Sequence, residues 1–211
     1  MKKSYFKYLL AGSFIYFISL SQLFGQSDSS GIMMISELGS KNTELSNLMS
    51  FQGIDYYNVK FVGKGLKQKY FSVLAKEIWN GKIKNIDTII NSKTNSKMSV
   101  IGYDTLSLTL FGSKTENNKL KLFFRFPMVG INRKYKATSS NDYFLSDIGA
   151  DVLRVKIENN KYFPAFVYML PYYEGEWKNY CGVKQSWVSV YDWGKEFKMK
   201  HYIIFEMKFE D

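Results

Sequence analysis

The sequence predicts a mainly β protein, in which an antiparallel meander forms a barrel-like or strongly coiled sheet with one or two short helices in the N-terminal third. Apolar and polar residues alternate with period two along several segments of the C-terminal two thirds, as in strands with one buried face. The last of these segments spans thirteen residues. Because strands usually have about 3 to 10 residues, we expect this one to be bent or bulged, as in a barrel or a coiled sheet.

Two hairpins carry most of this prediction. In residues 105–126, "TLSLTLF" and "LKLFFRF" alternate on either side of the polar run "GSKTENNK", which predicts a hairpin with a long turn. In residues 151–170, "DVLRVKI" and "YFPAFVYML" flank "ENNK", whose asparagines tolerate positive φ. Pro164 indicates an edge or a bulge in the second of these strands. The first hairpin places one apolar set on a single face: Leu106, Leu108, Leu110, Leu120, Leu122, Phe124 and Phe126.

The C-terminal segment predicts two more strands. "KQSWVSVY", residues 184–191, alternates and is followed by a turn at "DWGK". From Phe197 to Phe209 every second residue is apolar except His201, so we predict that His201 lies on the buried face. A buried histidine is largely neutral near pH 7, because burial disfavours its charged form.

The N-terminal third is more ambiguous. "NTELSNLMSFQG" predicts a short helix capped by Asn42 or Thr43 and stopped by Gly53, and residues 54–63 predict a strand. Residues 66–80 fit a helix, which we favour slightly, or a strand that enters a tight hairpin at Asn80 and Gly81. The helical reading gives an alternative α+β fold, with that helix packed on one antiparallel sheet. We expect loops at residues 91–97 and 130–142.

The N-terminus predicts export. Three lysines and no acid precede the apolar run from Leu9 to Leu20, and small residues follow from Gly25. This is the pattern of a signal peptide, and the apolar run is shorter than the roughly 20 residues of a membrane span. We therefore predict a signal peptide at residues 1–25 and a single mainly β domain at 26–211. A protein of bacterial type with this pattern is periplasmic or extracellular, and meets the membrane only transiently through its signal.

The charge of the chain limits the classes of binding partner that we expect. The chain has 29 basic and 19 acidic residues, and such a surplus favours anionic partners. For an exported protein we expect acidic polysaccharide or lipid headgroups and not nucleic acid, although the charge also fits simple solubility. "INRKYK", at residues 131–136, is a basic and aromatic segment that fits phosphate or acidic sugar, or a solvated loop.

The residue inventory excludes several chemistries. With one histidine and one cysteine, the chain cannot supply a structural zinc site of several His or Cys ligands. No C-x-x-C, H-E-x-x-H, phosphate-binding or nucleophile-elbow motif is present. A Cys181 and His201 dyad is the most specific catalytic arrangement that these residues still allow. A lone cysteine, however, is more often buried and inert. We predict no cofactor and no metal.

The stretch "LPYYEGEWKNYCGVKQSW", residues 170–187, is the candidate binding site. Its aromatic rings suit stacking on a sugar or an apolar ligand, and its carboxylates suit hydrogen bonds that orient the ligand. The same rings could instead close one end of the sheet and pack on its core. The candidate ligand-binding residues are Tyr172, Tyr173, Glu174, Glu176, Trp177, Tyr180 and Trp193.

Three classes of function follow. The first is a non-enzymatic binding domain for carbohydrate or a small amphipathic ligand, which the aromatic stretch favours. The second is a glycoside hydrolase that uses Glu174 or Glu176. If the loop is extended, these two side chains share one side, whereas hydrolysis needs carboxyls on both sides of the bond and so a further acid from elsewhere. The third is a structural or protein-interaction domain of the cell envelope. The sequence does not indicate an oligomeric state.

Overall fold

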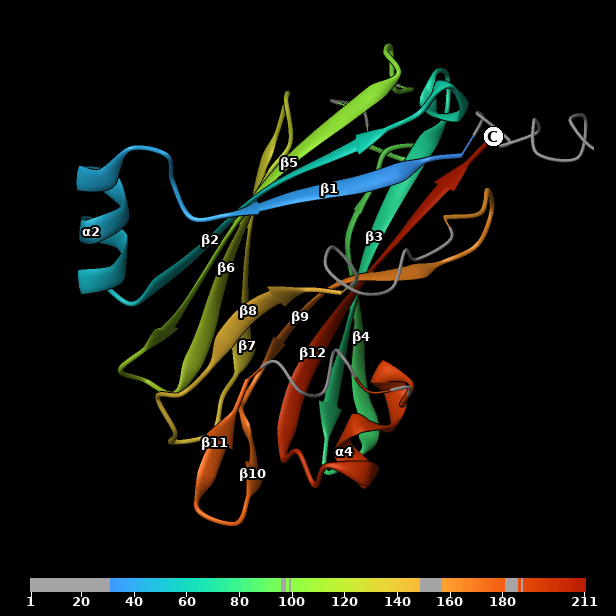
Figure 1. The fold of residues 1–211 in the computed structure, drawn as a ribbon. Helices are drawn as coiled ribbons and strands as arrows, with labels where there is room; N and C mark the ends of the chain where they lie inside the picture. The colour runs from blue at the N-terminus through green and yellow to red at the C-terminus, as the bar shows by residue number, and fades with distance from the viewer. Residues whose placement is uncertain (1–30, 96–97, 99, 149–156, 181–185, 187) are drawn as a thin grey trace, which may run out of the picture. The chain divides into compact units, whose positions relative to one another are not determined.

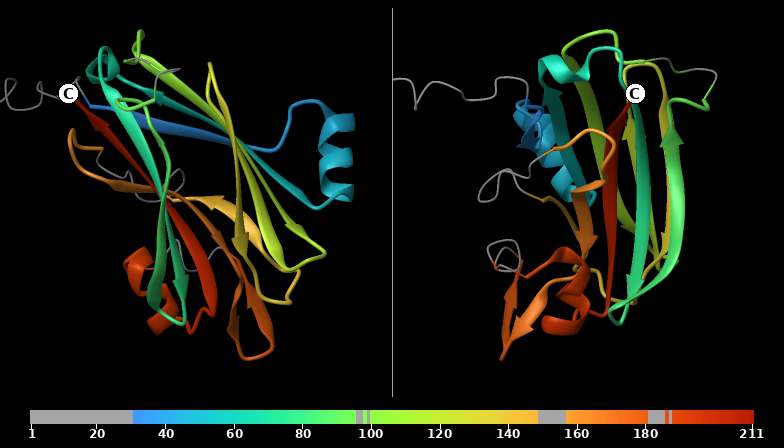
Figure 2. Two further views of the ribbon diagram at one scale, coloured as in Figure 1. Left: turned by 180° about the vertical axis from the view of Figure 1, so that it is seen from behind. Right: turned by 90° about the vertical axis from the view of Figure 1, so that its right-hand side faces the viewer.

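The strands form two five-stranded antiparallel sheets that share one hydrophobic core (Figures 1 and 2). The structure is a computed structural model that describes residues 31–95, 98, 100–148, 157–180, 186 and 188–211. The predicted signal peptide at residues 1–25 and most of the predicted strand at 151–157 lie outside the described residues. No helix in the described part of the chain is long and apolar enough to span a membrane.

The first sheet has the strand order β1-β2-β5-β6-β7. Its strands are β1 (Met33–Leu38), β2 (Ile54–Val62), β5 (Thr105–Thr115), β6 (Lys119–Arg125) and β7 (Gly130–Lys136). The helix α2 (Thr43–Phe51) connects β1 to β2. The second sheet has the order β4-β3-β12-β9-β8. Its strands are β3 (Tyr70–Trp79), β4 (Lys82–Asn91), β8 (Phe144–Asp147), β9 (Phe163–Met169) and β12 (His201–Glu210).

Short elements complete the fold. A 3-10 turn, η1 (Lys64–Leu66), precedes β3, and a small hairpin of β10 (Tyr172–Glu174) and β11 (Trp177–Asn179) follows β9. Before β12, η2 (Val190–Asp192) leads into the one-turn helix α4 (Trp193–Glu196). The side chains of Val190 and Trp193 pack on the outer face of the second sheet, against Tyr202 and Ile204 of β12.

Aromatic rings from both sheets meet in the core. Phe124 of β6 lies edge-on to Phe205 of β12, with ring centroids 5.3 Å apart. Phe61 of β2 contacts Phe209 in the same way at 5.3 Å. The sheets therefore pack face to face through the inward side chains that period-two alternation predicts.

Several sequence predictions are confirmed. Residues 105–126 form the β5–β6 hairpin with the predicted apolar face buried, although the strands extend further and leave a shorter turn, at residues 116–118. The helix α2 begins where Asn42 caps it, accepting a hydrogen bond from the Leu45 amide, and is followed by Gly53 with positive φ. The register between β9 and β12 shifts opposite Pro164, which is the predicted bulge.

Other predictions were wrong. The described strands form two open five-stranded sheets and one small hairpin, and not a closed barrel. The favoured helix at residues 66–80 is instead strand β3, because its apolar residues are buried in a sheet interior, and Asn80 and Gly81 make the tight hairpin with positive φ at both positions. With that helix absent, the α+β alternative loses its basis.

Two further segments differ from the sequence prediction. The expected loop at 130–142 contains β7, whose alternation is masked by polar residues on its exposed face. In the predicted strand 184–191, the described residues from Val190 onward form η2 and not a strand, and the expected turn at "DWGK" is mostly α4. Here the apolar residues are buried by helical turns that cover a sheet face.

Polar contacts join the two sheets at one edge of the core. Asp87 of β4 accepts hydrogen bonds from Arg133 Nε at 3.0 Å and from the Tyr135 hydroxyl at 2.9 Å, both on β7. The same guanidinium donates to the carbonyls of Thr88 and Ile89. Edge strand β7 of one sheet is thereby fixed to edge strand β4 of the other.

A second set of polar contacts joins the opposite edge. Ser36 of β1 donates a hydrogen bond to Asp147 of β8, and Asp55 of β2 accepts one from the Leu145 amide at 3.1 Å. Burial raises the pKa of Asp55 from 3.8 to about 6, although the hydrogen bonds from Leu145 and Tyr168 oppose this shift.

We predict that truncating the ring at the centre of the core destabilises the protein strongly. Phe205→Ala should lower the free energy of unfolding by about 3 to 5 kcal/mol, because Phe205 is fully buried and its loss leaves a cavity. Phe51→Ala is the matched control, since Phe51 of α2 is 89% exposed, and should change stability by about 0.5 kcal/mol or less. Urea unfolding monitored by circular dichroism measures both. Equal losses would contradict the described core.

We predict that Asp55 makes stability fall as pH rises from about 4 to about 6. The folded protein retains the Asp55 proton up to about pH 6, whereas the unfolded chain releases it near pH 4, so ionisation weakens folding across that window. Asp55→Asn should remove this contribution. Urea unfolding at half-unit pH steps tests it: the stability of the native protein minus that of Asp55→Asn should decrease from pH 4 to 6. A constant difference would refute the prediction.

Candidate functional site

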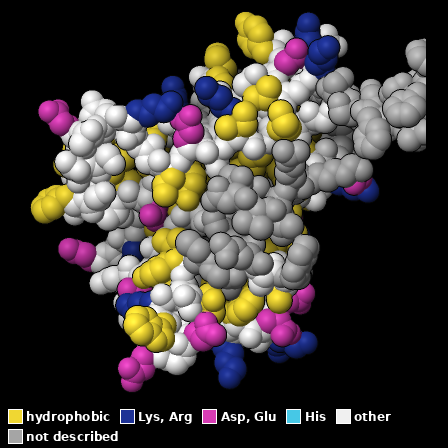
Figure 3. All heavy atoms as spheres, viewed as in Figure 1, with side chains coloured by type: hydrophobic (Ala, Val, Ile, Leu, Met, Phe, Trp, Pro, Cys, Tyr) yellow, Lys and Arg dark blue, Asp and Glu magenta, His cyan; other side chains and the backbone are white. Residues whose placement is uncertain are grey.

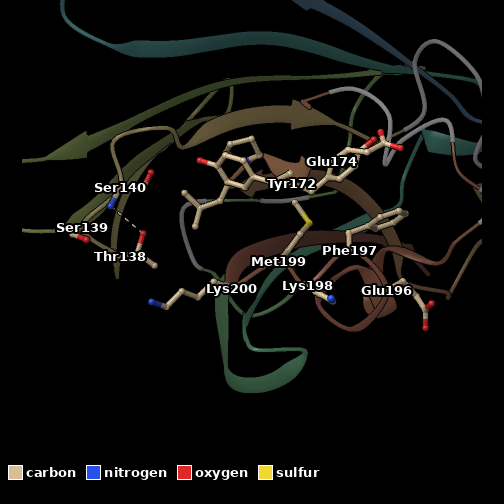
Figure 4. Close-up of a pocket in the computed structure, with 13 residues that line it drawn as sticks. Thr138, Ser139, Ser140, Tyr172, Glu174, Glu196, Phe197, Lys198, Met199 and Lys200 are labelled. Carbon is tan, nitrogen blue, oxygen red and sulfur yellow. Dashed lines mark hydrogen bonds between the residues drawn. The ribbon is translucent and has the colours of Figure 1, made fainter. Parts of the chain in front are cut away.

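A pocket of about 740 Å³ lies at the end of the sandwich where β7 and β9 finish and β12 begins (Figure 4). Three segments that are distant in sequence supply its walls: the connection after β7, the entry to β10, and the residues between α4 and β12. The lining residues are Thr138, Ser139, Ser140, Leu170, Pro171, Tyr172, Tyr173, Glu174, Glu196, Phe197, Lys198, Met199 and Lys200.

The floor of the pocket is apolar. Tyr172 and Phe197 lie together, with ring centroids 5.2 Å apart and planes at 48°, and Met199 beside them is buried. Figure 4 shows these three side chains converging at the centre of the site. Leu170 and Pro171 are also buried, so the rings rest on packed residues and are held in place.

Polar groups form the rim. The segment from Thr138 to Ser140 turns back on itself, since the Ser140 amide donates to the Thr138 hydroxyl at 3.3 Å (Figure 4). The charged side chains of the rim are exposed and carry both signs: Glu174, Glu196, Lys198 and Lys200. Figure 3 shows hydrophobic side chains among Lys, Arg, Asp and Glu at this lower end of the viewed face.

An ion pair connects the β10–β11 hairpin to the opposite rim. Lys178 Nζ lies 3.0 Å from Asp142 Oδ1, and Ser140 donates to the other oxygen of Asp142 at 3.0 Å. The hydrogen bond from Lys178 lowers the pKa of Asp142 and raises the pKa of Lys178. Both side chains are partly exposed, so the pair contributes more to the position of the hairpin than to stability.

The structure brings only three of the predicted site residues to the pocket. Tyr172, Tyr173 and Glu174 line it. Glu176 and Trp177 do not, and Trp177 is 79% exposed near the tip of the hairpin. Gly175 has positive φ and Glu176 does not, the pattern of a tight type II′ turn. The two glutamates are therefore not on one side of an extended loop.

The remaining two predicted residues pack elsewhere. Tyr180 lies edge-on to Phe144, with ring centroids 4.7 Å apart. Trp193 is buried on the outer face of the second sheet, where its Nε1 donates to the Val188 carbonyl at 3.1 Å. The alternative prediction, aromatic residues that pack on their own domain, describes Trp193, whereas Tyr180 packs on Phe144 and stays 37% exposed.

Sequence reasoning missed the other two walls of the pocket. Residues 138–140 fell in a segment read as a loop, and residues 197–200 were read as the start of the last strand. Phe197 and Met199 do follow the predicted parity, but β12 begins only at His201, and Lys198 just before it has positive φ. A strand that starts late leaves its first apolar residues free to line a pocket, and no local pattern marks that boundary.

A buried histidine lies behind the pocket wall. His201 is fully buried and stacks on Trp79, with ring centroids 4.0 Å apart. Its Nδ1 is 2.6 Å from the Tyr143 hydroxyl, which accepts a hydrogen bond from the Thr138 amide. The other ring nitrogen, Nε2, lies 3.6 Å from Glu77 and makes no hydrogen bond to a described residue.

Burial lowers the pKa of His201 from 6.5 to about 4. The ring is therefore neutral near pH 7, as the parity of the last strand predicted, and it is shielded from solvent. His201 supports two walls of the pocket: it follows the lining residue Lys200 in the chain, and Tyr143 links its ring to Thr138. Cys181, the other half of the predicted dyad, lies outside the described residues.

Neither a metal site among the described residues nor a known relative indicates what the pocket binds. Within the described ranges no three His, Cys, Asp or Glu side chains are grouped so that they could hold a metal ion. Comparison with protein-family models, curated proteins and solved structures finds no match for this chain.

We predict that His201→Leu lowers the free energy of unfolding by about 1 to 3 kcal/mol at pH 7, because the buried Tyr143 hydroxyl loses its partner. The stability of the native protein minus that of His201→Leu should also decrease as pH falls from 6.5 to 4, since the unfolded chain takes up a proton that the buried ring does not. Asp55 contributes equally to both proteins and cancels in this difference.

Tyr143→Phe is the control for this experiment. It removes the hydroxyl but keeps the buried imidazole, so the stability of Tyr143→Phe minus that of His201→Leu should still decrease as pH falls below 6.5. Urea midpoints between pH 4 and 7.5 measure all three proteins. If His201→Leu retains the full pH dependence, His201 is not the group that causes it.

Proposed function

We propose that this protein is an exported, non-enzymatic binding protein that holds a small carbohydrate in the pocket built around Tyr172 and Phe197. The observation that carries the proposal is an apolar, aromatic floor with a rim of hydroxyl, carboxylate and ammonium groups. The predicted signal peptide supports export, because the lysines, the apolar run and the small residues occur in the order that secretion requires.

The size of the pocket suits a small ligand. Its volume of about 740 Å³ lies within the roughly 300 to 1,000 Å³ typical of small-molecule sites. The walls come from rigid neighbours: the ends of β7 and β9 and the buried start of β12. A site on such a scaffold is largely formed before the ligand arrives, which reduces the ordering cost of binding.

The chemistry of the walls suits a sugar. The C–H face of a pyranose is apolar and packs on aromatic rings such as Tyr172, while its hydroxyl groups need donors and acceptors around the edge. The hydroxyls of Thr138, Ser139 and Ser140 and the carboxylates of Glu174 and Glu196 supply them. Because the rim carries charges of both signs, it favours a neutral saccharide over a strongly charged one.

Hydrolysis of the bound sugar is the alternative activity. It would need one carboxylic acid kept protonated and a second carboxylate across the bond. Glu174 and Glu196 both line the pocket, but both are exposed on its rim, whereas the general acid of such enzymes sits in an apolar environment. The arrangement therefore favours binding without turnover.

We predict that Tyr172→Ala weakens binding to neutral oligosaccharides by about tenfold or more, because the stacking surface at the floor is lost. Trp177→Ala is the matched control. Trp177 is on the same hairpin and more exposed, but it does not line the pocket, so its loss should change affinity by about twofold or less. A glycan array followed by titration calorimetry on the best oligosaccharide measures both variants.

The outcomes separate the candidate functions. If Trp177→Ala abolishes binding and Tyr172→Ala does not, the ligand sits at the tip of the hairpin and the pocket is not the site. Release of shortened sugars that stops in Glu174→Gln would favour the hydrolase. If no neutral glycan binds, the carbohydrate proposal fails and a structural or protein-interaction role becomes the better explanation.

A further inference from the structure

The outer face of the first sheet carries a row of aromatic rings beside a cluster of basic residues. Tyr56, Phe111 and Phe123 are direct cross-strand neighbours on β2, β5 and β6. Their ring centroids are 4.9 Å apart between Tyr56 and Phe111 and 5.9 Å apart between Phe111 and Phe123. A shallow hollow of about 380 Å³ lies along this row and includes Lys121 and Asn132.

The rings of this row are held across the sheet. A Cβ atom placed on Gly130 would lie 2.7 Å from the ring of Phe123, so this ring covers the glycine. Asn58 donates to the Tyr56 hydroxyl at 2.8 Å and accepts from the Thr109 hydroxyl at 3.0 Å. The row is thus a fixed surface with polar groups along its edge, remote in sequence from the pocket residues.

Lysines face each other directly on the neighbouring strands. Lys121 of β6 is opposite Lys134 of β7, and Lys119 is opposite Lys136. These pairs begin two residues from Phe123, a distance of about 7 Å along the strand. On the other side of the ring row lie Arg125 of β6 and Lys60 of β2. Six basic side chains therefore surround the ring row, and all are exposed: Lys60, Lys119, Lys121, Arg125, Lys134 and Lys136. Within the described part of the chain, none of the six makes an ion pair or a side-chain hydrogen bond.

This arrangement has an energetic cost. Like charges directly opposite in an antiparallel pair destabilise the sheet, and the outward-facing positions of β2, β5, β6 and β7 include no Asp or Glu to relieve them. Lysines on an edge strand can protect it from aggregation, which accounts for Lys134 and Lys136 on β7. It does not account for Lys119, Lys121 and Arg125, because β6 is an interior strand.

We propose that this face binds an acidic polysaccharide. Its sugar rings would rest on the row from Tyr56 to Phe123, and its carboxylate or sulfate groups would lie between the paired lysines, where an anion relieves their repulsion. Asn58, Thr109, Ser113 and Asn132 are positioned on the same face to bond sugar hydroxyls.

The geometry favours a polysaccharide over a single-stranded nucleic acid. Bases stack best on separate rings with open faces, whereas these three rings are neighbours tilted at 59° and 36° and partly packed on each other. A pyranose chain lying flat over the row needs no gap between the rings. This second site is independent of the proposed pocket, whose rim carries both signs of charge.

The test uses the exported protein, which begins at residue 26 by the predicted cleavage, and polygalacturonate as the probe. Lys121→Gln combined with Lys134→Gln should weaken binding about tenfold or more, and Phe123→Ala should weaken it further. Lys82→Gln combined with Lys84→Gln is the matched control: it removes the same charge from two exposed lysines of β4 on the second sheet, and should change affinity by about twofold or less. Thermal unfolding verifies that each variant is folded.

Additional ligands and variants distinguish this site from the pocket and from binding by net charge alone. Neutral dextran should not bind this face, and Tyr172→Ala should bind polygalacturonate as well as the native protein does, which separates this site from the pocket. Equal losses in the two lysine pairs would overturn the proposal, because binding would then follow net charge alone. Absence of polygalacturonate binding, or tighter binding of oligo-dT that depends on Phe123, would also overturn it, the latter in favour of nucleic acid.

Discussion

The burial of β12 on both faces is the constraint on which the rest of the structure depends. Its inward residues, from Ile203 to Phe209, meet the first sheet, while Tyr202 and Ile204 on the other face lie beneath η2 and α4. The strand also pairs along its whole length with β3 and on its other side with β9. A strand enclosed in this way fixes the position of both sheets and of the covering turns, and the residues that precede it become one wall of the pocket.

The two sheets differ because only one of them has covering helical turns on the described part of its outer face. The outer face of the second sheet buries Val190 and Trp193, so apolar side chains there serve stability. The outer face of the first sheet keeps Phe111 and Phe123 partly accessible among lysines. Aromatic residues at similar positions in two sheets therefore have different roles, and the neighbours of each ring decide which role it has.

Alternation predicts the strands well where one face is apolar and the other polar, as in β5 and β6. It fails for β3, whose residues are buried on both faces so that the apolar pattern also fits a helix, and for β7, whose exposed face is uniformly polar.

The candidate site is only partly predictable, because its residues come together through tertiary contacts that no local pattern shows. Tyr172, Tyr173 and Glu174 stand out in an aromatic stretch, but Thr138 and Met199 join them through tertiary contacts between sheet ends. Whether a ring such as Trp193 is buried or exposed depends on chain segments far from it, and composition does not encode that.

The contact between Gly81 and Gly194 has a consequence for how this sequence can vary. A Cβ atom on Gly194 would lie 2.6 Å from the Cα of Gly81, so the backbone of the turn over the second sheet rests directly on the β3–β4 hairpin. Gly81 is further restricted by its positive φ. Gly194 cannot gain a side chain unless the hairpin moves away, whereas a Cβ atom on Gly81 would lie 3.4 Å from the nearest atom of Gly194, so there the backbone conformation is the restriction. In relatives of this protein, a glycine at the position of Gly194 should therefore mark chains that keep this cover over β12.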